Sequence, residues 1–163
     1  MANTQSMCTS FMGDLLVGAQ QLSTVTLTSR GSLTAPTTDT VKAALYLASA
    51  TLNASTTVYS STGEVTGTNY VAGGVTVTNA NAVTATNSST TAGVAYWTPS
   101  ASIVYTNVTL TTAFDCVFLY NSTQGNKAIS VHTFGSQTVT AGTFTLTMPA
   151  STTSTALIRL ATT

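Results

Sequence analysis

Charge is the scarcest property of this 163-residue chain. Charged residues make up 5% of it, against about 25% in an average soluble protein, and the formal net charge is zero. The four acids are Asp14, Asp39, Glu64 and Asp115, and the four bases are Arg30, Lys42, Lys127 and Arg159. Because nucleic-acid binding depends on clustered Lys and Arg, these scattered bases argue against a nucleic-acid partner. Near-zero net charge favours association, so we expect a subunit of an assembly.

Reactive side chains are also few. Nucleophilic catalysis needs a Ser or Cys beside a His that a third group orients. The one histidine, His132, shares a strand face with Phe134, which is typical of a rim position. Three Cys and His residues are too few for a zinc site, and the acids are too far apart for a calcium loop. A glycosidase-like pair of Glu64 and Asp115 has no support in the sequence. We predict no catalytic residue, metal or cofactor.

The chain also lacks the marks of export and membrane insertion. Residues 1–20 carry no Lys or Arg before their apolar part, which argues against a secretory signal. No apolar run approaches the roughly 18 residues that a spanning helix needs, so no membrane partner is predicted. Without secretion, Cys8 and Cys116 are expected to stay reduced.

Threonine is what the chain has in excess, with 38 residues. Thr is β-branched and suits a half-buried pleated surface. Hydrophobic residues make up 43% of the chain and the mean hydropathy is +0.30, which argues against disorder. With only three prolines, a mucin-like stalk is also a poor interpretation.

The apolar pattern predicts an all-β fold, an antiparallel β-sandwich that is either Ig-like or a jelly roll. Residues 10–20 are the exception and predict one short helix, with Ser10 as its N-cap. We therefore divide the chain into an N-terminal arm with this helix, residues 1–21, and a single β-sandwich domain, residues 22–163.

About eight to ten short strands are expected. Their main segments are residues 22–30, 40–48, 74–86, 94–110, 113–121, 127–135, 137–149 and 155–161. Residues 74–86 read as a hairpin that turns at 79–81. A change of alternation predicts a bulge near Asn107, and the continuous apolar run 113–121 predicts a central strand covered on both faces. Ala141 and Gly142 mark an expected break or tight turn.

Two stretches combine rare acids and glycines at fixed spacing. The first contains DTVKAALY (residues 39–46) and TGEVTGTNYVAGG (62–74), and the second runs from FLYNSTQGNKAISVHTFG (118–135) to TVTAGTFT (138–145). Preceded by SFMGDLLVG (10–18), they resemble, in this order, a family of small tailed-bacteriophage virion structural proteins. The similarity covers most of residues 10–149.

This resemblance implies a non-enzymatic particle component. We expect a capsid decoration, or cement, protein that is made in the host bacterial cytoplasm and lies on the capsid exterior of the virion. Its partners would be the major capsid protein and copies of itself, as a dimer or trimer. The alternative is a tail-associated component that binds a receptor or a glycan.

The apolar side chains of the N-terminal arm form a candidate interface. They are Met7, Phe11, Met12, Leu15 and Leu16. Such an arm could add to a neighbouring subunit, as exposed strands and arms do in other assemblies. The alternative is that the helix covers the protein's own sandwich.

Glu64, the only glutamate, lies in a glycine-rich loop without a second acid, histidine or lysine nearby. We expect its carboxylate to accept hydrogen bonds from backbone N–H groups of the loop and to stabilise a turn around which Tyr59 and Tyr70 pack. A competing hypothesis places Tyr59, Tyr70, Tyr96 and Trp97 in a sugar-binding platform, although such aromatics more often fill a core or an interface.

Overall fold

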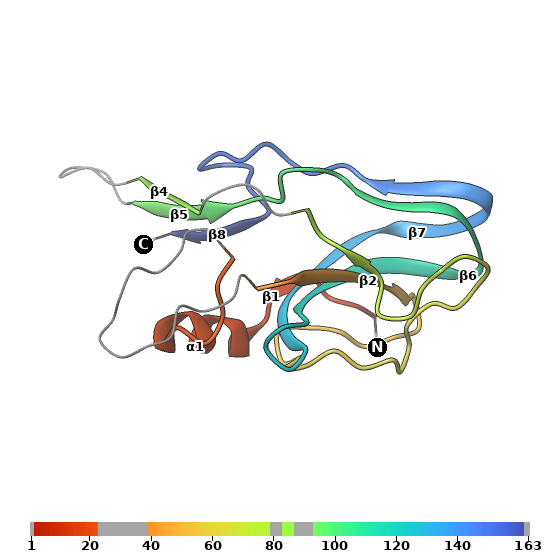
Figure 1. Cartoon of the computed structure of the whole chain (residues 1–163), viewed down its shortest axis with the longest axis horizontal. Helices are drawn as coiled ribbons and strands as arrows, with labels where there is room; N and C mark the ends of the chain where they lie inside the picture. Colours follow the sequence, from red (N-terminus) through yellow and green to blue (C-terminus); the bar gives the residue numbers. More distant parts are fainter. Residues whose placement is uncertain (1, 23–38, 79–82, 87–92, 162–163) are drawn as a thin grey trace.

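The computed structural model describes residues 2–22, 39–78, 83–86 and 93–161 (Figure 1). It is mostly strand, with antiparallel sheets and one short N-terminal helix, which confirms the predicted all-β, sandwich-like fold. The expected strand 22–30 lies outside the described residues except for Leu22, as do Arg30 and the turn at 79–81.

The described elements form two sheets and one helix. In chain order they are β1 (Ser6–Met7), α1 (Thr9–Val17), β2 (Val41–Leu47), β3 (Val75–Thr76), β4 (Thr84–Thr86), β5 (Val94–Trp97), β6 (Ile103–Asn121), β7 (Lys127–Leu146) and β8 (Ile158–Ala161). The large sheet has the order β1-β7-β6-β2-β3, and the small sheet has the order β4-β5-β8. In Figure 1 the small sheet lies at the left, above α1.

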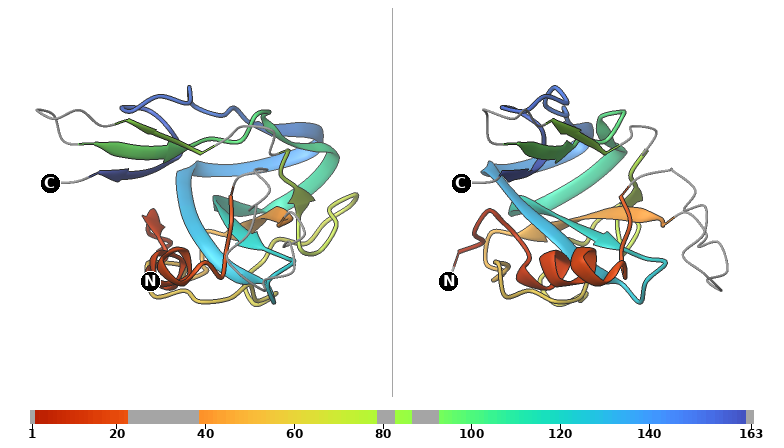
Figure 2. Two further views of the ribbon diagram at one scale, coloured as in Figure 1. Left: turned by 60° about the vertical axis from the view of Figure 1, so that its left-hand side comes forward. Right: turned by 90° about the vertical axis from the view of Figure 1, so that its left-hand side faces the viewer.

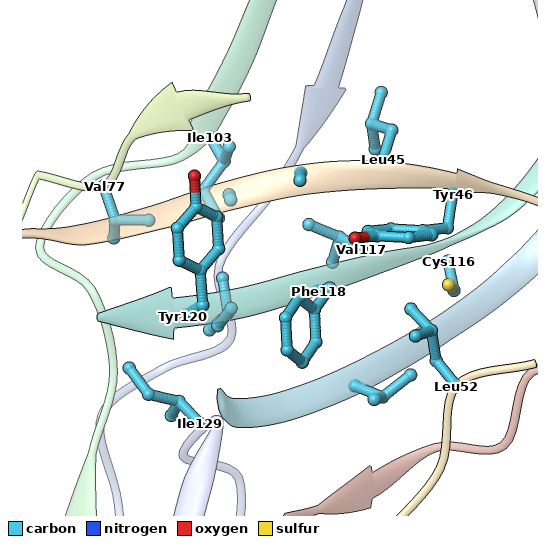
Figure 3. Close-up of a cluster of buried hydrophobic side chains, with 14 of the residues drawn as sticks. Leu45, Tyr46, Leu52, Val77, Ile103, Cys116, Val117, Phe118, Tyr120 and Ile129 are labelled. Atoms are coloured by element: carbon cyan, nitrogen blue, oxygen red, sulfur yellow. The ribbon is translucent and has the colours of Figure 1, made fainter. Parts of the chain in front are cut away.

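The core is built on β6, the middle strand of the large sheet. Its second half, residues 113–121, pairs with β2 on one side and β7 on the other, and nearly every side chain there is buried. Figure 3 shows Val117 and Phe118, consecutive residues of β6, on opposite sides of the sheet. Both faces of this segment are therefore covered, as the continuous apolar run predicted.

β6 and β7 are long strands that bend together at one end of the molecule, so that each contributes to two layers (Figure 1). Irregular pairing accompanies the bend. Leu110 pairs with Val139 and Phe114 with Gln137, so β6 has extra residues on this side of the ladder. Extra residues on one strand of a pair increase its bend and twist.

Two expected irregularities lie on these strands. The pairing shifts between Tyr105 and Val108, and Asn107 between them has φ 51°, which confirms the predicted bulge. Ala141 has φ 45°, but β7 continues through it, so the expected break at Ala141 and Gly142 is a local irregularity within one strand. The next residue, Gly142, pairs with Val108, so the ladder continues past Ala141.

Two local predictions are wrong. Residues 74–86 do not form a hairpin, because β3 pairs with β2 in the large sheet while β4 pairs with β5 in the small one. Ser10 is not the N-cap of the helix, since α1 begins at Thr9 and Cys8 holds the cap position without a side-chain hydrogen bond. The helix ends at Gly18, whose left-handed conformation (φ 72°) suits glycine.

Candidate functional site: the Glu64 cluster

Glu64 lies at the outer edge of β2, where that strand lacks a continuous neighbour. β3 covers Lys42 and Ala43, and the backbone of Glu64 bridges Tyr46. Leu45 lies between these two contacts. Its carbonyl accepts the Val65 N–H at 3.0 Å, and its N–H donates to the Tyr70 hydroxyl at 3.0 Å. The Tyr70 hydroxyl thus takes the place of a backbone acceptor for the Leu45 N–H at this edge of the strand.

The Glu64 carboxylate holds this arrangement together. Oε1 accepts the Tyr70 hydroxyl at 2.7 Å and the Gly73 N–H at 2.8 Å, and Oε2 accepts the Tyr59 hydroxyl at 2.6 Å. The residue is only 6% exposed, so its charge is compensated by three donors rather than by water. The sequence-based hypothesis named backbone donors alone, whereas two of the three donors are tyrosine hydroxyls.

Two further tyrosines from β6 pack on this arrangement. Tyr120 stacks on Tyr59 with ring centroids 4.6 Å apart and donates to the Gly73 carbonyl at 2.8 Å. Tyr105 stacks on Tyr70 at 6.0 Å and donates to the Ala43 carbonyl at 2.8 Å. We call Glu64 with Tyr59, Tyr70, Tyr105 and Tyr120 the Glu64 cluster. The β6 tyrosines were not expected from sequence, because they lie far along the chain from the loop.

Glycines of the loop allow its close approach to the strands. A side chain at Gly74 would overlap the Ala43 carbonyl, and Gly74 has φ +71°. A side chain at Gly67 would overlap the Thr109 carbonyl on β6. The loop backbone lies directly against two strands at these two positions of the TGEVTGTNYVAGG stretch, and only glycine leaves room for that contact.

The cluster is suited to holding structure rather than to proton transfer. Burial, followed by the hydrogen bond to Glu64, raises the pKa of Tyr59 and of Tyr70 above the ordinary tyrosine value. Both hydroxyls therefore stay protonated and act as donors at neutral pH. Each oxygen of the carboxylate already has an internal partner and the residue is only 6% exposed, so little of the group is accessible to a substrate.

The other titratable candidates lie apart from this cluster. Asp115 accepts a hydrogen bond from Asn3 Nδ2 at 2.6 Å, so the structure does not place it with Glu64 as an acid pair. His132 lies on β7, which contributes no residue to the Glu64 cluster, and its Nε2 is 2.8 Å from Ser130 Oγ. Among the described residues, no group of three or more His, Cys, Asp or Glu side chains could hold a metal ion.

The aromatics proposed as a sugar platform are separated. Trp97 is 1% exposed and belongs to the core, and Tyr59 and Tyr70 are engaged with Glu64. Tyr96 lies on β5 in the small sheet. The four rings do not form one exposed surface.

The candidate interface residues of the N-terminal arm divide into two groups. Phe11 is fully buried, and Met7 and Leu15 are half-buried against the core, so this side of the helix packs on the protein itself. Both views of Figure 2 show α1 beside β7. Met12 is 41% exposed and Leu16 is 89% exposed, so only the outer side of α1 is free within the described structure.

Backbone bonds attach the residues before the helix to the sandwich. Thr4 N donates to Leu52 O at 2.8 Å, and Cys8 N donates to Ile129 O at 2.9 Å. Within the helix, Asp14 forms an ion pair with Lys127 at 2.7 Å. The segment predicted as an arm is thus fastened to the domain at several points.

The structure also contains a second buried carboxylate network that sequence reasoning missed. Asp39 accepts hydrogen bonds from Gln21 N at 2.9 Å, Asn121 Nδ2 at 2.6 Å and Gln124 Nε2 at 2.8 Å. It joins the start of β2 to the turn between β6 and β7. The signal available in the sequence was the rarity of the acid itself, since each scarce acid of this chain makes internal bonds.

Both cysteines are buried and free. Burial raises the pKa of Cys8 to about 11 and that of Cys116 to about 12. A thiol with such a pKa is almost entirely protonated at neutral pH, which makes it a poor nucleophile.

Comparison with protein-family models, with curated proteins and with solved structures finds no match to this chain. The helix α1, the one helix among the described residues, has nine residues and is too short to span a membrane.

Proposed function

We propose that this protein is a non-enzymatic structural protein of a bacteriophage virion, a capsid decoration protein that binds the assembled shell of major capsid protein. The observation that supports it most is the internal engagement of the acids. Asp14, Asp39, Glu64 and Asp115 all bond within the chain. Each acidic side chain therefore accepts at least one hydrogen bond from within the chain.

The same observation supports a role in assembly. With its acids used internally and few bases, the protein presents hydroxyl and apolar groups to its surroundings. Such a surface has little charge to desolvate when it is covered by another protein, and burying an unpaired charge is costly. We therefore favour a partner that covers a broad neutral surface, as a capsid shell would.

Copy number in purified virus particles tests this proposal. Gel densitometry of the purified phage particles should give a fixed ratio of this chain to the major capsid protein. Presence in far fewer copies would favour a tail component that binds a receptor or glycan. Absence from mature particles would refute both roles.

We propose the outer side of α1 as one contact with the shell or with a second copy. Leu16 is 89% exposed and Val17 is 77% exposed, and the opposite side of the helix is buried through Phe11. Two aliphatic side chains this exposed on an otherwise packed helix are suited to burial by a partner. A charge placed there should weaken assembly without affecting the fold.

A further inference from the structure

Two adjoining hollows lie on the face of the large sheet that carries His132. The first has a volume of about 230 Å³, and its walls include Val117, Leu119, Phe134, Leu146, Met148 and Leu157. The second has a volume of about 350 Å³ and lies between β1, β7 and β8. Gln5, His132 and Leu157 line both hollows, so the apolar hollow leads into the second one.

The second hollow contains a cation without an internal partner. Arg159 of β8 lines it and is exposed. Within the described part of the chain, the guanidinium takes part in no ion pair or hydrogen bond. An arginine fork can bind a carboxylate with two parallel hydrogen bonds, so this end of the site favours a planar anion.

His132 supplies a second polar group where the two hollows meet. Its Nε2 is engaged with Ser130 Oγ at 2.8 Å, which leaves Nδ1 as the remaining polar atom of the ring. Burial lowers the pKa of His132 to about 4, so the ring is neutral at pH 7. If Ser130 donates to Nε2, the ring proton lies on Nδ1, and that N–H can donate to an anion.

We propose that the two hollows form a binding site for a small monocarboxylate with an aromatic body. The body occupies the apolar hollow and the carboxylate meets Arg159 and His132. An apolar cavity of about 150 Å³ holds benzene, so about 230 Å³ accommodates one or two fused rings. The site goes beyond the proposed structural role and does not depend on it.

Calorimetric titration at pH 7 with 2-naphthoate tests the site, with 2-naphthol and acetate as comparison ligands. We expect naphthoate to bind at one site, naphthol to bind about tenfold more weakly, and acetate not to bind in the same concentration range. Arg159→Gln should weaken naphthoate about tenfold and leave naphthol unchanged. Lys42→Gln is the matched control, because it removes an equal charge from β2, outside both hollows.

The apolar part is tested by Met148→Trp, which fills the first hollow and should abolish binding of both aromatic ligands. Should that variant fail to fold, amide chemical-shift mapping on the wild type provides the same test. Shifts concentrated at His132, Leu157 and Arg159 support the site. No naphthoate binding, equal loss in Lys42→Gln, or shifts confined to other surfaces would overturn it.

Discussion

Replacing Glu64 with glutamine tests whether the Glu64 cluster stabilises the fold. Glutamine has the same shape, so its Oε1 can still accept from Tyr70 and from Gly73 N. Its amide N–H would face the Tyr59 hydroxyl, which would have to turn and accept a hydrogen bond instead of donating one. The substitution therefore removes the charge from three hydrogen bonds while retaining most of their geometry.

The expected loss follows from the strength of those bonds. A hydrogen bond to a charged group contributes about 1.5–3 kcal/mol and a neutral one about 1 kcal/mol, so each of the three bonds should weaken by about 0.5–2 kcal/mol and the variant should lose about 1.5–6 kcal/mol of unfolding free energy. For a chain of this size, 2 kcal/mol corresponds to a fall in Tm of about 4–8 °C. Urea unfolding and thermal melts measure both quantities.

Two tyrosine variants provide an internal control. Tyr59→Phe removes one bond to Glu64, whereas Tyr70→Phe also leaves the Leu45 N–H without its acceptor. Because an unsatisfied buried donor is costly, Tyr70→Phe should be the more destabilising of the two. Equal effects of the two would contradict the proposed completion of the β2 edge. A Glu64→Gln protein with an unchanged melting curve and lost particle binding would instead make Glu64 a contact residue.

Three further predictions concern the surface, pH and the thiols. Leu16→Glu should leave Tm nearly unchanged and lower incorporation into particles, whereas Val71→Glu, an exposed control away from α1, should leave both Tm and incorporation unchanged; equal incorporation of both variants would refute the α1 contact. The pKa of His132 is about 4 in the fold and about 6.5 when unfolded, so the unfolded chain takes up a proton first as pH falls. In urea titrations, the unfolding free energy should be constant with respect to His132 above pH 6.5 and fall by up to about 3 kcal/mol by pH 4. His132→Gln should remove this dependence on pH. Iodoacetamide should modify Cys8 and Cys116 only after unfolding, as mass spectrometry would show; rapid labelling of the native protein would contradict their burial.

The periodicity of the sequence was sufficient to predict those features that depend on residues close together in the chain. Residues 113–121 predicted a strand covered on both faces, and β6 has that place in the sheet. The change of alternation around Asn107 predicted the bulge, because side-chain period and strand pairing shift together. The position of the only glutamate, Glu64, among tyrosines and glycines was enough to predict that its carboxylate stabilises a turn of this loop.

Strand pairing and the completion of the Glu64 cluster depended on the whole chain. The turn-like residues between 74 and 86 predicted a hairpin, but the strands on either side pair in different sheets. Tyr105 and Tyr120 lie on the two halves of β6, and both reach the loop because the strand bends between them. Likewise, Arg159 and His132 line one hollow although 27 positions apart.

The sequence by itself determined that this chain forms strands, has few reactive groups and has little charge to present. These follow from composition and from a two-residue period, which are local properties. Only the tertiary structure decided which edges pair, which hydroxyls reach the single glutamate, and which side of α1 stays exposed. Those outcomes depend on contacts between residues far apart in the chain, and no local pattern specifies them.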